Sequence, residues 1–361
     1  MTGDKCVRRF KLAHYHRFHR AGFFDQNRQS SVGNQTVSSS TENRQSTIGN
    51  HRVSLYIPCY NAERYIERTI EGALRQTYPL DEILVIDDGS QDRTREIASR
   101  YPVRIVSHDR NRGLAAARNT GVRSARNELV ASLDADCVPE PDWLEKLLPH
   151  LNDPKVAAVG GRLEESVQTS IADRWRKAHL REDWGPSPVV NPPFLFGANG
   201  LHRRSAIEAV GGYDEVTWPE GCGEDTDISR RLRGQGYNLV YEPAAVVKHI
   251  KQDNVRSVLD ARWRWWRYGV EAYFKRVRLR SIAATFYRAH FRTMFFDHVR
   301  QDSRPRRFEL LWLDLLCLFY MPYRDFKLYG HTKITSSWPH SERSVDSRDS
   351  IHHQHNVQTF R

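Results

Sequence analysis

Two aspartates with one residue between them follow an apolar run of the sequence. Asp134 and Asp136 come directly after Leu129–Leu133, a run typical of a buried strand. Their carboxylate oxygens are the hard ligands that Mg²⁺ and Mn²⁺ prefer, with water positions left open for a diphosphate. A surface turn with an N-capping aspartate can contain the same residues. The pair therefore indicates either a metal site or an ordinary turn.

A second acidic turn, residues 87–90, follows the apolar run at residues 82–86. Asp88 can accept hydrogen bonds from a nucleobase N–H or from ribose hydroxyls, and Gly89 permits a tight turn. The alternative is a turn that caps the next helix. Tyr60, after the apolar run at residues 53–57, could stack on a base or could simply pack inside its loop.

A third acidic pair, Glu224 and Asp225, begins a predicted helix after Gly223. The helix dipole favours a negative charge there, so we expect the carboxylate to stay ionised and able to take a proton from an acceptor hydroxyl. An ordinary N-cap is the alternative.

Arg118, in an alanine-rich helix, could reach a base or phosphate or lie at the surface. His249, after a predicted strand, could bind a divalent ion, although a lone histidine seldom does.

Alternating strand-like and helix-like segments must position these residues. Apolar runs at 53–57, 82–86, 103–106 and 128–133 alternate with helical spacing at 62–76, 92–100 and 114–124. This alternation predicts an α/β fold with a mostly parallel sheet. Sheets of this kind bind ligands at the carboxyl ends of their strands, which is where the acidic residues fall.

The rest of the chain continues this pattern with one interruption. Residues 141–160 predict a helix and a strand, whereas residues 165–196 are rich in Trp and Pro and predict irregular structure. After this segment, the sequence predicts helices at 205–210 and 225–234 and strands at 238–241 and 245–248.

Composition restricts the partners and the compartment. The 361 residues include 55 Lys and Arg against 44 Asp and Glu, a net charge of +11, which favours a nucleotide, a phospholipid headgroup or a nucleic acid. The five cysteines lack C-x-x-C spacing, which argues against a disulfide framework or zinc ribbon and fits a reducing compartment.

No apolar stretch of about 18 residues exists, so we expect no membrane span. The start of the chain is a poor signal peptide, and a cytoplasmic location is expected.

Four regions are predicted along the chain. Residues 1–50 and 336–361 are polar tails that we expect to be disordered, and they enclose an α/β domain at 51–253. Residues 254–335 form a helical region in which Arg alternates with Trp, Tyr and Phe. This region suits peripheral contact with the inner face of a membrane, or a lipid-linked acceptor, or a layer packed on the α/β domain. A nucleic-acid partner is not expected, because no known nucleic-acid module is present.

The order of these motifs resembles that of the family 2 glycosyltransferases of the GT-A fold. The resemblance covers roughly residues 51–250 and rests on six segments: Val53–Asn61, Asp87–Ser90, Gly113–Gly121, Asp134–Asp136, Gly197–Asn199 and Glu224-Asp225. It implies a mostly parallel central sheet flanked by helices, followed by a helical C-terminal extension.

The resemblance also implies a role for each matched residue. The nucleotide pocket would be lined by Pro58, Tyr60, Asn61, Glu63, Asp88, Arg118 and Asp134. A Mn²⁺ or Mg²⁺ ion would be held by Asp136 as direct ligand, with Asp134 and His249. Asp225 would be the catalytic base with Glu224 beside it, and a loop near the donor sugar and the acceptor would comprise Gly197, Ala198 and Asn199.

The activity implied is metal-dependent, inverting transfer of a sugar from a nucleotide-diphosphate donor to a hydroxyl. The commonest donor in the family is a UDP-sugar, with guanosine and thymidine donors left open. The implied acceptor is a glycan or lipid-linked glycan in cell-surface polysaccharide synthesis. Processive members carry Gln-x-x-Arg-Trp after the Glu-Asp helix; here residues 230–233 are Arg-Arg-Leu-Arg, which predicts a single-addition enzyme.

Two other functions stay open at this point. A nucleotidyltransferase would use a similar nucleotide-binding fold and Mg²⁺, but it usually needs a glycine-rich basic signature that residues 53–61 lack. A non-catalytic glycan or membrane-surface adaptor on a transferase fold would not need Asp134, Asp136 and Asp225, all of which are present.

Overall fold

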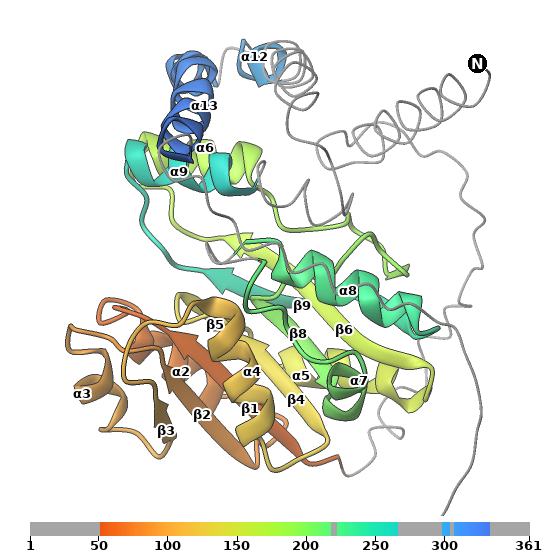
Figure 1. The fold of residues 1–361 in the computed structure, drawn as a ribbon. Coiled ribbons are helices and arrows are strands. Elements are labelled where there is room, and N and C mark those ends of the chain that lie inside the picture. The colour runs from red at the N-terminus through yellow and green to blue at the C-terminus, as the bar shows by residue number, and fades with distance from the viewer. Residues whose placement is uncertain (1–50, 218–221, 266–297, 304–306, 333–361) are drawn as a thin grey trace, which may run out of the picture. The chain divides into compact units, whose positions relative to one another are not determined.

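The computed structural model describes residues 51–217, 222–265, 298–303 and 307–332 (Figure 1). The predicted tails at 1–50 and 336–361 lie outside these residues, and so does the stretch 266–297 of the basic aromatic region. The chain divides into two units, Met1–Met321 and Pro322–Arg361. Within the described residues, the second unit contains only the end of one helix.

The first four long strands of the sheet are parallel and follow the predicted apolar runs. β1 (Val53–Cys59) pairs with β2 (Glu82–Asp87) on one side and with β4 (Leu129–Leu133) on the other. β2 also pairs with β3 (Arg104–Ser107). All residues of β1 and β4 are buried, as expected for strands covered on both faces.

The second half of the sheet is mixed in direction. β8 (Asn199–Arg203) runs antiparallel to β4 and to β6 (Val156–Glu165), and β6 is parallel to β9 (Asn238–His249). Two short strands lie antiparallel to β9, namely β5 (Cys137–Pro139) and β7 (Val189–Val190). The order is β3-β2-β1-β4-β8-β6-β9-β5. Parallel pairing therefore holds for the N-terminal half and for β6 with β9.

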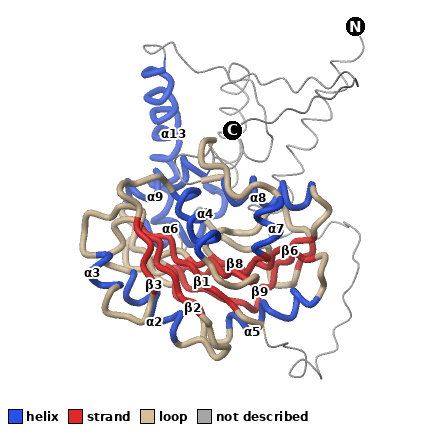
Figure 2. The backbone as a smooth tube through the Cα atoms, turned by 60° about the horizontal axis from the view of Figure 1, so that its bottom comes forward, coloured by secondary structure: helices blue, strands red, loops and turns tan. Residues whose placement is uncertain are grey.

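Helices cover both faces of this sheet (Figure 2). One face packs against α2 (Ile66–Leu74), α3 (Thr94–Ala98), α5 (Trp143–Leu147) and the 3₁₀ turn η2 (Leu148–Asn152). The other packs against α4 (Leu114–Ser124), α7 (Arg204–Ala209) and α8 (Glu224–Gly234).

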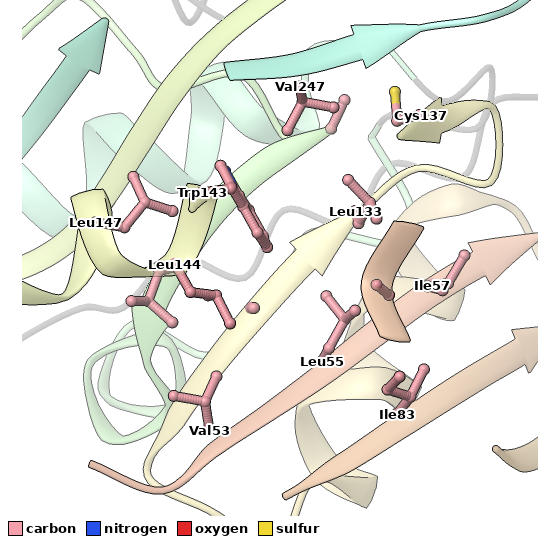
Figure 3. Packing of buried hydrophobic residues seen from close by; sticks show 14 of the residues in the cluster. Val53, Leu55, Ile57, Ile83, Leu133, Cys137, Trp143, Leu144, Leu147 and Val247 are labelled. Atoms are coloured by element: carbon pink, nitrogen blue, oxygen red, sulfur yellow. The ribbon is translucent and has the colours of Figure 1, made fainter. Parts of the chain in front are cut away.

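Alternate residues of β1 supply the two cores. Val53, Leu55 and Ile57 belong to the cluster that surrounds Trp143 (Figure 3), whereas Tyr56 belongs to the opposite cluster. This follows from the two-residue period of a strand. Burying one such side chain contributes about 1.5–3 kcal/mol, so the apolar runs fix which strand face meets which helices.

Two local predictions were wrong. The strands expected at 238–241 and 245–248 are one strand, β9, because β6 stays paired across an irregularity in which Gly161 faces Glu242 and Arg162 faces Val246. The segment expected to be irregular contains α6 (Ile171–His179), which begins with a capping box between Ser170 and Asp173. Apart from Ala172, its buried residues are Asp, Trp, Arg and His, so an aliphatic pattern does not reveal it.

Further helices follow β9. They are α9 (Val255–Arg264), α12 (Val299–Asp302), the 3₁₀ turn η5 (Phe308–Leu310) and α13 (Leu311–Thr332). Trp175 of α6, Val258 of α9 and Leu313 of α13 belong to a third apolar cluster. Among the described residues, no helix has both the length and the apolar character required to cross a membrane.

Candidate active site

Arg118 links three parts of the chain at the carboxyl end of the sheet. This residue belongs to α4 and is 1% exposed. Nη1 donates to the Gly197 carbonyl at 2.7 Å and to Ser132 Oγ at 2.9 Å, and Nη2 donates to Asp134 Oδ1 at 2.9 Å. Nε lies 3.5 Å from Glu224 Oε1. A buried charge needs such partners, so this arginine fixes the relative positions of β4, the loop before β8 and the start of α8.

Two glycines allow Arg118 to occupy this position. A Cβ atom on Gly121 would lie 2.5 Å from the Tyr56 ring, so only glycine lets α4 pack this closely on β1. A Cβ atom on Gly197 would lie 2.8 Å from Arg118 Nη2. Both positions therefore need a residue without a side chain for steric reasons.

Asp136 and His249 lie together near Asp134. His249 Nε2 is 3.4 Å from Asp136 Oδ2, and His249 Nδ1 is 2.8 Å from Glu165 Oε2. The pairing of β5 with β9 places them there, because Cys137 faces His249 across the ladder. Glu165 thus orients the imidazole so that its other nitrogen faces Asp136.

The charges in this group are strongly coupled. Burial alone would lower the pKa of His249, but the carboxylates of Asp136 and Glu165 raise it to about 10. Burial would raise the pKa of Asp136, but His249 and Lys251 hold it well below its usual range. Burial raises the pKa of Asp134, although Arg118 opposes that shift.

This donor set fits a divalent cation. A carboxylate and an imidazole nitrogen 3.4 Å apart have the separation of two neighbouring ligands on an ion with bonds of about 2.1 Å. A carboxylate on the second imidazole nitrogen, as Glu165 provides, is the usual outer partner of a metal-binding histidine. Asp136 and His249 could therefore hold the ion, with Asp134 beside them.

Asp225 faces the same loop from the start of α8. Its Oδ2 accepts a long hydrogen bond from the Gly197 N–H at 3.4 Å, and Oδ1 accepts from the Thr226 N–H at 2.7 Å. Burial raises the pKa of Asp225, and burial together with the Asp225 charge raises the pKa of Glu224 to about 7. These shifts oppose the direction expected from the helix dipole, because loss of solvation outweighs it.

The residues predicted near the nucleotide organise one loop. Asn61 Oδ1 accepts from the Gln91 N–H at 2.8 Å, and Glu63 Oε2 accepts from the Arg93 N–H at 3.2 Å. Pro58 is buried in β1. Tyr60 differs from its neighbours, since it is 47% exposed and its ring is accessible to a ligand.

Asp88 holds the loop that precedes α4. Its Oδ1 accepts from the Arg112 N–H at 2.9 Å and lies 2.6 Å from His108 Nδ1, and its Oδ2 accepts from the Gly113 N–H at 2.9 Å. The carboxylate is buried. It follows that Asp88 positions the helix that carries Arg118.

The predicted residues thus occupy one edge of the sheet but do not all meet. Direct contacts connect Asp134, Arg118, Gly197, Glu224 and Asp225, and connect Asp136 with His249.

The other predicted residues of this edge bond elsewhere. The partners of Asp88 lie in the loop before α4. The side-chain amide of Asn199 is buried. Its Oδ1 accepts a hydrogen bond from the Trp143 indole N–H at 2.7 Å, and its Nδ2 donates to the Arg162 carbonyl at 3.0 Å. Ala198 is also buried.

Three residues of the site have no place in the sequence prediction. Ser132, the one polar residue of β4, supports Arg118 and donates to the Gly197 carbonyl at 2.7 Å. A polar residue inside an apolar run could have been recognised in the sequence as a candidate site residue. No comparable feature of the sequence points to Glu165 and Glu182. Burial raises the pKa of Glu182 to about 8, while His249 and Arg176 oppose the shift.

Comparison with known proteins shows what this chain is similar to. Residues 54–211 match Glycosyl transferase family 2. The pre-mycofactocin glycosyltransferase of Mycobacterium tuberculosis (strain ATCC 25618 / H37Rv) is 34% identical over 184 residues, which are 48% of this chain and 38% of that protein. A glucosyl-dolichyl phosphate glucuronosyltransferase of Haloferax volcanii is 28% identical over 252 residues, 63% of this chain and 77% of that protein. The chain thus spans well under half of the mycobacterial relative.

A solved structure shares the fold. The mannosyltransferase PcManGT from Pyrobaculum calidifontis, in complex with GDP-Man and Mn²⁺, superposes with a TM-score of 0.50 at 21% identity. The match covers 90% of this chain and 92% of that one. The predicted GT-A fold, a central sheet flanked by helices with a C-terminal helix, is confirmed. The sheet is mixed and not mostly parallel, because β5, β7 and β8 run antiparallel to their neighbours.

Proposed function

We propose that the chain, whose residues 54–211 match Glycosyl transferase family 2, is a metal-dependent, inverting glycosyltransferase. The observation that carries the proposal is the Arg118 network. It joins Asp134 to the Gly197 loop and Glu224, so that a cation site and a candidate base lie on either side of one loop.

Asp136 and His249, with Asp134 beside them, would hold a Mn²⁺ or Mg²⁺ ion. When bound, the ion neutralises the negative charge that develops on the departing nucleoside diphosphate. Arg118 acts differently. Its guanidinium is buried and paired with protein groups, so we assign it a positioning role at Asp134 and Gly197.

Asp225 would act as the general base. It takes the proton from the acceptor hydroxyl as the acceptor oxygen bonds to the anomeric carbon and the bond to the diphosphate oxygen breaks. Two backbone N–H groups, those of Gly197 and Thr226, hold its oxygens in place. A single displacement on the face opposite the diphosphate inverts the anomeric centre and requires no covalent intermediate.

The donor would be a nucleotide-diphosphate sugar, whose base can stack on the exposed ring of Tyr60. PcManGT was solved with GDP-Man, so a guanosine donor stands beside the uridine donor expected from the family resemblance. The acceptor would be a glycan or a lipid-linked glycan in cell-surface polysaccharide synthesis. The Haloferax relative is named a glucosyl-dolichyl phosphate glucuronosyltransferase, and this name supports a lipid-linked acceptor.

We also propose peripheral membrane contact through residues 254–335. Apolar side chains at η5 and along α13 are exposed with helical spacing: Phe308 is 67% exposed, Trp312 42%, Leu315 50% and Phe319 75%. A helix with such a stripe suits the membrane interface. The site would then lie at the cytoplasmic face of the membrane, where a lipid-linked acceptor is within reach.

The deciding experiment incubates the full chain and Mn²⁺ with UDP-, GDP- and dTDP-sugars, and separately with nucleoside triphosphates and sugar phosphates. Release of a nucleoside diphosphate from one nucleotide sugar, abolished by a chelator, is expected. Release of pyrophosphate from a triphosphate would instead indicate a nucleotidyltransferase. A folded protein that does neither would support the adaptor.

A further inference from the structure

A second cluster of buried titratable side chains lies outside the candidate active site, among α6, α12 and α13. It consists of His179, His298, Asp302 and Asp314, each at most 1% exposed. One ligand atom from each of His179, His298 and Asp314 can be chosen so that all three lie within 4.8 Å of one another. Asp302 Oδ2 is 2.8 Å from His179 Nε2.

The geometry brings both imidazoles to the same carboxylate. Asp314 Oδ1 is 3.9 Å from His179 Nε2 and 3.7 Å from His298 Nδ1. The two imidazole rings stack with centroids 4.0 Å apart. The indole N–H of Trp175, one turn before His179 on α6, donates to Asp314 Oδ1 at 2.8 Å. This donor fixes the carboxylate, as outer partners do around metal ligands.

Three buried atoms of the cluster lack a hydrogen-bond partner: His179 Nδ1, Asp302 Oδ1 and Asp314 Oδ2. Buried polar atoms are normally paired. Asp302 and Asp314 lie within hydrogen-bond reach of each other, so their oxygens need either a shared proton or a cation between them. The positive groups that face it are Arg262, buried on α9, and Arg307. Burial and the neighbouring Asp302 raise the pKa of Asp314 to about 7. A cation between the carboxylates would satisfy these oxygens and offset their repulsion.

We propose that His179, His298 and Asp314 bind one divalent transition-metal ion of the zinc class, with Asp302 as the fourth ligand. Two imidazoles with carboxylate oxygens form a donor set that suits Zn²⁺. All four side chains are buried, which is typical of a closed structural site. The ion would tie α6 to α12 and α13, segments more than a hundred residues apart in the chain.

The test separates this site from the one beside His249. Full-length His249→Gln protein, in which the candidate catalytic site is impaired, is stripped with a chelator and titrated with Zn²⁺ or Co²⁺. We expect one equivalent to bind, a visible Co²⁺ spectrum, and a Tm that rises by several degrees. Asp314→Asn in the same background keeps an acceptor for the Trp175 N–H and should weaken binding at least tenfold. The matched control is Glu309→Gln, an exposed carboxylate near the start of α13 that pairs with Arg174 and should leave the metal affinity unchanged.

Two results would overturn the proposal. One is a folded His249→Gln protein that binds neither ion, in which case Arg262 and a shared proton balance the carboxylates. The other is unchanged metal binding after Asp314→Asn. If Asp314→Asn does not fold, zinc-edge X-ray absorption of the His249→Gln protein decides: two imidazole ligands without sulfur support the site, and sulfur scattering, as from the nearby Cys317, contradicts it.

Discussion

Asp225 is the residue on which the proposed chemistry depends. Replacing it by Asn keeps its shape but removes the proton acceptor, so we expect the rate of transfer to fall by about 10²–10⁴. Donor affinity, measured by calorimetry with Mn²⁺, should change by less than about threefold, because Asp225 contacts the Gly197 loop and not the cation residues. Glu208→Gln, an exposed carboxylate on α7, is the control. Equal loss of binding and turnover would contradict a base role.

The pH dependence of transfer follows from the same carboxylate. A base works only when ionised, and burial raises the pKa of Asp225 above the ordinary value of about 3.9. Activity should therefore be lost as pH falls, with a midpoint displaced towards neutrality. The measurement is kcat/KM against pH at saturating Mn²⁺. The residual activity of Asp225→Asn should lack this acid limb, and its persistence there would assign the limb to another group, such as Glu224.

A substitution at Glu165 tests the proposed cation site while leaving its ligands unchanged. Its carboxylate orients His249, so Glu165→Gln should raise the Mn²⁺ concentration for half-maximal activity by about tenfold or more. The maximal rate at saturating Mn²⁺ should change much less. Glu164→Gln, the exposed neighbour on β6, is the matched control. An unchanged Mn²⁺ requirement in Glu165→Gln would remove the support for a metal on His249.

From the sequence, candidate site residues could be chosen by their types, but the contacts between them could not be predicted. The sequence made Asp134, Asp136 and Asp225 candidates because their carboxylates stand at the ends of predicted elements. Nothing in the sequence indicated that Glu165 would orient His249, because their pairing depends on the register of β6 with β9. Nor could spacing indicate that Asp88 bonds with the loop before α4.

At the scale of elements, the contact of α4 with β1 decides where Arg118 sits. In Gly121→Ala the new Cβ would lie 2.5 Å from the Tyr56 ring, so we expect a loss of about 1–3 kcal/mol in the free energy of unfolding and reduced transfer. Gly234→Ala, at the end of α8, meets nothing within 4 Å and should be neutral or stabilising by up to about 1 kcal/mol. Denaturant unfolding of both variants makes the comparison; equal stabilities would contradict the packing argument.

Strands with continuous apolar runs were predictable, and elements whose buried face is polar were not. β1, β2 and β4 are buried on both faces, so their composition is unmistakable. α6 buries Trp175, Arg176 and His179, and each of these side chains bonds to an aspartate far away in the chain. Such long-range pairs have no local pattern, which is why this segment was expected to be irregular.

At the scale of the whole molecule, the insertion of antiparallel β8 between β4 and β6 brings the site together. It carries the Gly197 loop to the end of β4, next to Asp134. Alternation of strands and helices predicts parallel neighbours, but it does not predict which later strand joins β4 or in which direction. The α/β class was therefore accessible from the sequence, whereas the contact between the Gly197 loop and Arg118 required the fold.

The exposed stripe on α13 provides the last prediction. Burial of one large apolar side chain in a membrane interface contributes about 1.5–3 kcal/mol at most. The double variant Trp312→Ser/Phe319→Ser should therefore weaken binding to vesicles of phosphatidylcholine with anionic phosphatidylglycerol by more than about tenfold in flotation assays. Both side chains are exposed, at 42% and 75%, so Tm should change little. Val216→Ser is the matched control, since Val216 is 87% exposed on a loop outside this stripe. Flotation equal to that of the control would show that the stripe does not meet the membrane.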